Sequence, residues 1–191
     1  MKVDMIHVGL HKTGTSWLQY EVFPRINKNI ISNELFSGRP FRLTIDDIID
    51  TNEREYYAKL LREKYGDVKI LLGLRNPDTL IPSLYSQYLK GGGTMGYRLW
   101  RNIGFNPKYI SYQRYVDFLR TIFSDVKIYH YEEIKDNKEL FINELCEWLG
   151  CPVPKYRDYV INKGLSNWQK KKYWFKNNIT QKKLDLKHLL N

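Results

Sequence analysis

The sequence contains little cysteine and no long apolar segment. Its two cysteines, Cys146 and Cys151, are too few for a disulfide framework, so we expect free thiols in a reducing compartment. No apolar run reaches the roughly 18 residues that a membrane span requires. The first apolar strand begins at Val3, which leaves no room for a signal peptide before it. These absences predict a cytoplasmic location, and the four histidines show no metal-ligand spacing, so no metal site is expected.

Acidic residues are outnumbered by basic ones. The chain has 31 Lys and Arg against 21 Asp and Glu, which gives a net charge of +10. Residues 163–191 alone hold eight lysines and one acidic residue, Asp185. A basic excess favours anionic partners such as nucleotides, acidic polysaccharides, nucleic acids or anionic lipids, and it does not choose among them. A solvated, lysine-rich helical face is an equally good interpretation of this C-terminal segment.

Apolar strands alternate with helical segments along the chain, and no internal repeat is visible. We expect strands at residues 3–8, 29–32, 68–74 and 126–130. We expect helices at residues 16–27, 52–65, 78–89, 111–123 and 137–149, and a partly helical tail at residues 166–190. This alternation predicts an α/β fold in which helices cover both faces of a parallel β-sheet. At 191 residues, the chain is expected to form a single domain, residues 1–191.

The most informative segment lies between the first strand and the first helix. Its sequence is His7-Val8-Gly9-Leu10-His11-Lys12-Thr13-Gly14-Thr15-Ser16-Trp17-Leu18-Gln19. A loop rich in glycine and hydroxyl groups between a strand and a helix suits an anion, because backbone N–H groups and the positive helix end point at the ligand together. Lys12 adds a full charge. Thr13, Thr15 and Ser16 add hydroxyl donors.

This loop differs from the phosphate loop of ATPases and GTPases, which has a lysine directly after its second glycine. Here the spacing of Gly9 and Gly14 fits, but Thr15 takes the place of that lysine and Lys12 stands inside the loop. The segment resembles the 5′-phosphosulfate loop of sulfotransferases that use 3′-phosphoadenosine-5′-phosphosulfate (PAPS), in particular carbohydrate-type, small microbial or viral members. The resemblance implies a P-loop nucleoside-kinase-like sulfotransferase fold. It also implies that the loop from Lys12 to Trp17 binds PAPS.

A second motif follows the third predicted strand. Arg75 stands at the end of that strand, and Ser83 lies eight residues later on the next predicted helix. This pair resembles the 3′-phosphate site of the same family. The residue types suit that role, because a guanidinium binds phosphate bidentately and a hydroxyl on the following helix can donate to the same group.

A late loop supplies further candidates. Lys163-Gly164 resembles the family's last nucleotide-contacting loop, although Asn162 stands where cytosolic members have an arginine. The resemblance implies that Lys163 contacts the 3′-phosphate and that Trp168 stacks on adenine. Packing of Trp168 on the core is the alternative.

The reaction needs a base that accepts the proton of the acceptor. Glu34 follows the second predicted strand beside the anion loop, and some carbohydrate sulfotransferases use a glutamate at a similar place. Apolar Leu35 and Phe36 next to it favour a raised carboxyl pKa, which suits a general base. His11 is the second candidate, because it adjoins the loop lysine and has the right chemistry. Lys12 itself is placed to stabilise the leaving phosphate.

Residues 91–107 begin with Gly91-Gly92-Gly93 and show no clear periodicity. An irregular segment of this length in a compact domain is typically functional, so we expect a lid over the acceptor site, hinged at the glycines. A disordered surface insertion is the alternative.

Together these features predict an enzyme that moves a sulfuryl group from PAPS to a hydroxyl or amine, releases 3′-phosphoadenosine-5′-phosphate (PAP) and needs no metal. The expected acceptor is a saccharide, and the basic tail and aromatic lid would suit an anionic one. A nucleotide or nucleoside kinase of the same fold, dependent on ATP and magnesium, is one rival interpretation. A non-catalytic basic binding module is the other. No recognised nucleic-acid signature accompanies the basic tail, so a nucleic-acid partner is not expected.

Overall fold

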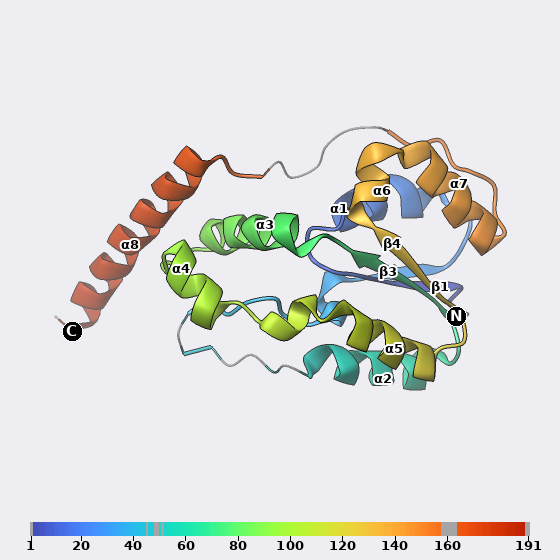
Figure 1. The fold of residues 1–191 in the computed structure, drawn as a ribbon, viewed down its shortest axis with the longest axis horizontal. Helices are drawn as coiled ribbons and strands as arrows, with labels where there is room; N and C mark the ends of the chain where they lie inside the picture. Colours follow the sequence, from blue (N-terminus) through green and yellow to red (C-terminus); the bar gives the residue numbers. More distant parts are fainter. Residues whose placement is uncertain (1, 45, 48–49, 51, 158–163, 190–191) are drawn as a thin grey trace.

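The computed structural model has a four-stranded parallel sheet at its centre (Figure 1). It describes residues 2–44, 46–47, 50, 52–157 and 164–189. The strands are β1 (Met5–Gly9), β2 (Ile30–Ser32), β3 (Lys69–Leu74) and β4 (Val126–His130). Their order across the sheet is β2-β1-β3-β4, so β1 and β3 are the central strands. The predicted parallel α/β fold is confirmed, with strand ends that differ by only a few residues.

The central strands are buried on both faces of the sheet. Every residue of β1 is buried, and so is β3 beyond its first residue. Ile6 and Val8 face one core, while Met5 contributes to the core on the opposite face. Such two-sided burial is typical of parallel strands covered by helices. His7 is the polar exception within β1, and it is completely buried.

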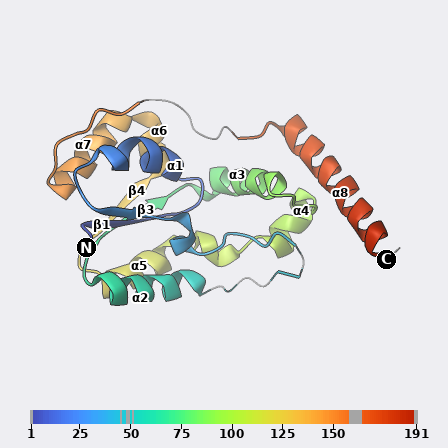
Figure 2. The same ribbon diagram turned by 180° about the vertical axis from the view of Figure 1, so that it is seen from behind.

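Helices cover both faces of the sheet, as Figures 1 and 2 show. One face is covered by α2 (Glu53–Tyr65), α3 (Pro77–Lys90) and α5 (Tyr112–Ile122). The other is covered by α1 (Thr15–Trp17), η1 (Leu18–Val22), η2 (Phe23–Arg25), α6 (Tyr131–Asp136) and α7 (Lys138–Leu149). Short 3-10 turns η3 (Glu34–Ser37) and η5 (Pro107–Ile110) complete the connections.

The first helix is less regular than the sequence predicts. Residues 16–27 were expected to form one α-helix, but α1 gives way to a π-helical turn, η1, and then to the 3-10 turn η2. Pro24 lies at the start of η2. Because proline has no N–H and its ring clashes with a carbonyl one turn earlier, it disfavours continuation of a regular α-helix at this point.

The expectation that residues 91–107 are irregular is wrong. This segment contains α4 (Tyr97–Leu99) and the π-helical turn η4 (Trp100–Gly104). Trp100 is fully buried, with its ring 5.2 Å from that of Tyr85. Gly93 serves packing, since a Cβ there would lie 2.2 Å from the Tyr88 ring. The π-helical turn explains why the sequence shows no α-helical period. The role of this segment as a lid stays a prediction.

The C-terminal helix α8 (Asn167–Leu189) lies at the end of the molecule away from β1 (Figure 2). The Asn177 side-chain amide donates to the carbonyls of Leu89 and Gly93, both at 2.8 Å. These bonds attach α8 to the C-terminal end of α3. Within the described ranges, every helix is too short or too polar to cross a bilayer.

Candidate functional site

A cavity of about 410 Å³ lies beside the loop that follows β1. It is lined by Lys12, Gly14, Thr15, Ser16, Trp17, Glu34, Arg75, Ser83, Ser86, Gln87, Lys90, Tyr131 and Gly164. Several of these residues lie within three residues of the carboxyl ends of β1, β2, β3 and β4, the edge where parallel sheets bind their ligands. The size is within the range of small-molecule sites.

The anion loop has a tightly constrained backbone. Lys12 and Gly14 both adopt positive φ, 68° and 86°. A left-handed conformation is natural for glycine but costs a lysine of the order of 1 kcal/mol, so the surroundings must hold Lys12 in place. The hydroxyl of Thr13 donates to the Leu10 carbonyl at 2.6 Å and closes the turn from inside. The N–H of Leu18 donates to the Gly14 carbonyl, so the helix starts at the loop.

Arg75 links the second motif to the loop. Its Nη1 donates to the Lys12 carbonyl at 2.9 Å, and its Nε donates to the Thr79 hydroxyl at 3.0 Å. Its guanidinium also stacks over the Tyr131 ring, 4.3 Å from the centroid. These contacts hold the guanidinium in one orientation at the cavity wall. A fixed arginine can receive a phosphate without a further loss of side-chain entropy.

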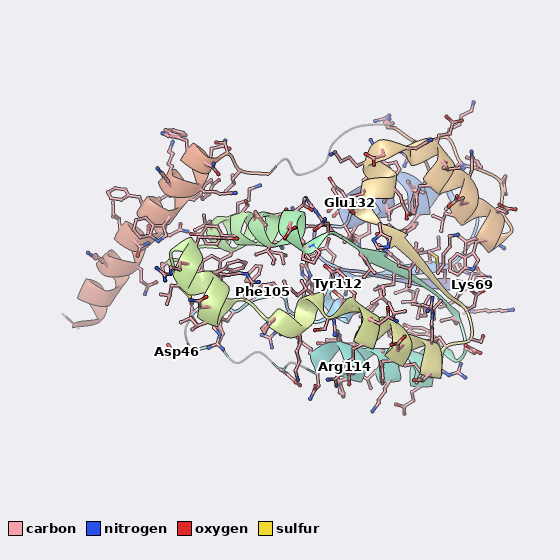
Figure 3. All side chains as sticks on the ribbon, in the orientation of Figure 1. Asp46, Lys69, Phe105, Tyr112, Arg114 and Glu132 are labelled. Carbon is pink, nitrogen blue, oxygen red and sulfur yellow. The ribbon has the colours of Figure 1, made fainter. Side chains whose placement is uncertain are left out.

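The turn after β3 is held from two sides by Tyr112 and Glu132, both of which are labelled in Figure 3. The Tyr112 hydroxyl, from α5, donates to the Arg75 carbonyl at 2.7 Å. The Asn76 N–H donates to a Glu132 carboxylate oxygen, from α6, at 3.4 Å. The Asn76 side chain accepts the Asp78 N–H and so caps α3. Helices from both faces of the sheet therefore fix the position of Arg75.

Lys12 and Glu34 share one end of the cavity and influence each other. Burial raises the pKa of the Glu34 carboxyl, while Lys12 and a hydrogen bond from Thr15 oppose the rise. Burial lowers the pKa of the Lys12 amine, and the positive charge of Lys90 lowers it further. Glu34 opposes that change and Arg75 adds to it. A carboxylate with a raised pKa is a better proton acceptor, so the site holds a base beside a cation.

The second candidate base, His11, lies behind the cavity wall. Its Nδ1 is 2.8 Å from the Tyr109 hydroxyl, and its backbone N–H donates to the same oxygen. Its Nε2 is 3.9 Å from a Glu34 carboxylate oxygen. Burial, together with the charge of Lys12, lowers the pKa of His11 to about 4. His11 is therefore a buried neutral imidazole next to Glu34, and it is not among the lining residues.

The other predicted site residues are placed in different ways. Thr13 is fully buried and points inward, so it can contribute only its backbone to the cavity. Trp17 lines the cavity while its Nε1 donates to the Arg157 carbonyl at 3.0 Å. Gly164 lines the cavity, whereas Lys163 lies outside the described residues. Trp168 is 69% exposed on α8 and is not a lining residue.

Four lining residues were not predicted. Ser86, Gln87 and Lys90 follow Ser83 at helical spacings of three, four and seven, so they share its face of α3. That spacing was available in the sequence and could have identified them. Tyr131 follows β4 directly, and the strand-end rule that selected Arg75 could have selected it too.

The arrangement can bind a polyanion and accept a proton at the same place. Lys12 and Arg75 bring positive charge to the wall, and backbone N–H groups at the start of α1 add their dipoles. Across the part of the chain that the structure describes, no cluster of three His, Cys, Asp or Glu side chains is arranged to hold a metal ion.

Comparisons with known proteins bear on the fold. No protein-family model matches the sequence, and no curated protein matches it significantly. A crystal structure of a sulfotransferase from Alicyclobacillus acidocaldarius is similar to this chain, with a TM-score of 0.60 and 14% sequence identity over 93% of both chains. Mouse sulfotransferase SULT7A1, solved in complex with PAP, is similar with a TM-score of 0.52 and 14% identity. That match covers 93% of this chain and 65% of the mouse protein. This chain has the fold of these two sulfotransferases.

Proposed function

We propose that this protein is a PAPS-dependent sulfotransferase that transfers a sulfuryl group to a hydroxyl or amine of a saccharide. One observation carries the proposal: a single cavity brings together the anion loop, Arg75, Ser83 and Glu34. These groups come from three separate parts of the chain. Their meeting at the carboxyl edge of the sheet supports one site for an anionic donor and a proton-bearing acceptor.

The residues present fit a donor with two separate phosphate-type groups. The loop from Lys12 to Ser16 offers backbone N–H groups, hydroxyls and a lysine for the 5′-phosphosulfate. Arg75 and Ser83 offer a guanidinium and a hydroxyl for the 3′-phosphate. Gly164, which also lines the cavity, would contact the nucleotide through its backbone. Lys163, which lies outside the described residues, is also proposed to contact the 3′-phosphate.

The donor supplies an activated sulfuryl group, and the chain's own residues supply positioning and charge. Glu34, with its raised pKa, takes the proton of the acceptor hydroxyl or amine as the new bond to sulfur forms. Lys12 stabilises the charge that develops on the phosphate as the old bond to sulfur breaks. His11 is the second candidate for the base, and Glu34 is preferred because it lines the cavity.

The proposal that the acceptor is a saccharide rests on the position of Glu34 and on the polarity of the cavity. Ser86, Gln87 and Lys90 extend the wall of α3 beyond Ser83 with two hydrogen-bonding side chains and one cation. Such groups suit a polyhydroxylated ligand that carries negative charge. A simple apolar alcohol could make few polar contacts with these groups.

A ligand panel tests the proposal directly. The melting temperature is measured with PAP, AMP, and ATP plus magnesium, since a ligand that binds the native state raises it by mass action. PAP is expected to stabilise best, and Arg75→Ala is expected to abolish that preference. Arg120→Ala is the matched control, because Arg120 is an exposed arginine on α5 that does not line the cavity.

Two outcomes would reject the proposal. Greater stabilisation by ATP with magnesium would favour a nucleotide or nucleoside kinase of the same fold. No response to any nucleotide would favour a basic binding module, for which the lysines of α8 would be the natural surface.

A further inference from the structure

A chain of polar side chains lies beneath the anion loop, on the face of the sheet that packs against α1. We call it the buried relay, and its members are Gln19, Ser32, His7 and Tyr129. The relay ends on the carbonyl oxygen of Thr13. Successive distances are 3.0 Å from Gln19 Nε2 to Ser32 Oγ, 2.7 Å from Ser32 Oγ to His7 Nδ1, 3.0 Å from His7 Nε2 to Tyr129 Oη, and 3.2 Å from Tyr129 Oη to Thr13 O.

The direction of every hydrogen bond in the relay follows from the group at its end, the Thr13 carbonyl. A carbonyl can only accept, so the Tyr129 hydroxyl donates to Thr13. The Tyr129 oxygen then accepts from His7, which must carry its proton on Nε2. The Nδ1 of the ring is left as an acceptor for the Ser32 hydroxyl. Burial lowers the pKa of His7 to about 3, in keeping with this single neutral tautomer.

Two glycines of the sheet leave space for the side chains of His7 and Tyr129. Gly73 is paired with Tyr129 across β3 and β4, and a Cβ at Gly73 would lie 2.3 Å from the Tyr129 hydroxyl. A Cβ at Gly9 would lie 2.6 Å from His7 Nε2. The two central side chains of the relay are essentially inaccessible, with 0% exposure for His7 and 1% for Tyr129, while Gln19 and Ser32 are half-buried. Polar groups at such depth are costly unless each is paired, so a chain of paired groups here calls for a role.

We propose that the buried relay positions the anion loop by fixing the peptide between Thr13 and Gly14. The C=O and N–H of a trans peptide point in opposite directions. Because Tyr129 holds the Thr13 carbonyl toward the core, the Gly14 N–H is turned the other way, toward the cavity that Gly14 lines. The relay members do not themselves line this cavity. Their effect on a ligand passes through the loop.

This inference rests on the proposed function, which assigns the 5′-phosphate end of the donor to this loop. The relay ties that end to the edge strand β2 through Ser32 and to the π-helical turn η1 through Gln19. A fixed N–H costs no reorganisation when charge arrives, which is how preorganised donors stabilise an anion. Loss of the relay should therefore weaken binding of the 5′-phosphate and leave the 3′-phosphate site intact.

Tyr129→Phe tests the relay, because it removes one hydroxyl and keeps the ring. Binding of PAP and of adenosine 3′-monophosphate, which lacks the 5′-phosphate, is measured on the wild-type protein and on the variant by titration. We expect PAP to bind about tenfold more weakly to Tyr129→Phe, from the loss of one buried hydrogen bond. Binding of the 3′-monophosphate should be unchanged.

Tyr115→Phe is the matched control. Tyr115 is another fully buried tyrosine, and its hydroxyl has no hydrogen-bond partner among the residues that the structure describes. This variant should bind both nucleotides as the wild-type protein does. Ser32→Ala is a second probe, since it removes the donor to His7 and keeps the bond from Tyr129 to Thr13. It should cause a smaller loss that is again confined to PAP.

The outcomes separate the relay from the proposed function. Unchanged PAP binding by Tyr129→Phe, with normal binding by the wild-type protein, would overturn the relay and leave the sulfotransferase proposal standing. Equal losses for both nucleotides would also overturn it, because they would indicate a general structural defect. Failure of the wild-type protein to bind PAP would overturn both.

Discussion

Acidification from pH 7 to pH 5 should destabilise this protein through two buried histidines. His7 and His11 are buried and neutral, and burial lowers the pKa of His7 to about 3 and that of His11 to about 4. In the unfolded chain both imidazoles would titrate near pH 6.5. Between that value and the folded pKa, the unfolded state binds more protons than the folded state. The free energy of unfolding therefore falls as the pH falls through this window.

The size of the effect follows from the two shifts. Each histidine contributes up to about 1.4 kcal/mol per pH unit within its window. Integrated from pH 7 to pH 5, the loss is about 2 kcal/mol for each histidine and about 4 kcal/mol for both. Glu34 has the opposite sign, because its raised pKa favours the folded state as the pH falls, and it offsets part of this loss. A domain is typically stable by about 5–15 kcal/mol, so the effect is large.

Urea unfolding followed by tryptophan fluorescence at pH 7 and pH 5 measures this difference. His11→Gln should reduce the loss between the two pH values by about half. His130→Gln is the control, since that side chain is exposed at the end of β4, and it should leave the loss unchanged. Equal stability of the wild-type protein at both pH values would refute the reasoning, as would an unaltered loss in His11→Gln.

Two further changes should have distinct effects. Gly73→Ala places a Cβ 2.3 Å from the Tyr129 hydroxyl and should lower the free energy of unfolding by about 1–3 kcal/mol. Urea unfolding checks this, with Gly96→Ala as the neutral control because nothing lies within 4 Å of a Cβ there. Glu34→Gln should keep PAP affinity and lower the rate of sulfuryl transfer to the acceptor by at least about 100-fold, since the amide cannot accept the proton. Sulfate transfer assays check this, and unchanged turnover would remove Glu34 from the mechanism.

The parts of the site that the sequence predicted depend on short-range patterns. The anion loop and the pair of Arg75 and Ser83 each occupy one strand, one turn and one helix, so local spacing places them at strand ends. A parallel sheet then brings those ends to one edge without further information. The same rule would have added Tyr131, and helix periodicity would have added Gln87 and Lys90.

The parts that the sequence did not predict depend on long-range contacts or unusual turns. His7 is completely buried, and its partner Tyr129 is 122 residues away. Nothing local indicates that pairing. The π-helical turn η4 has no α-helical period, which explains why residues 91–107 were expected to be irregular. The first helix was predicted to be too regular, because the effect of Pro24 at the start of η2 was not taken into account.

The charged side chains around the cavity influence the pKa of Lys12, and an anionic donor would change that influence. Lys12 lies near Lys90 and Arg75, and these like charges lower the pKa of its amine, as burial does. The Glu34 carboxylate opposes this lowering of the Lys12 pKa, and burial raises the pKa of Glu34 itself. A phosphate-type anion placed among these cations would relieve their repulsion and raise the pKa of Lys12. Binding would therefore favour the charged form of Lys12 at the step that needs its charge, while the buried relay beneath holds the loop that carries it.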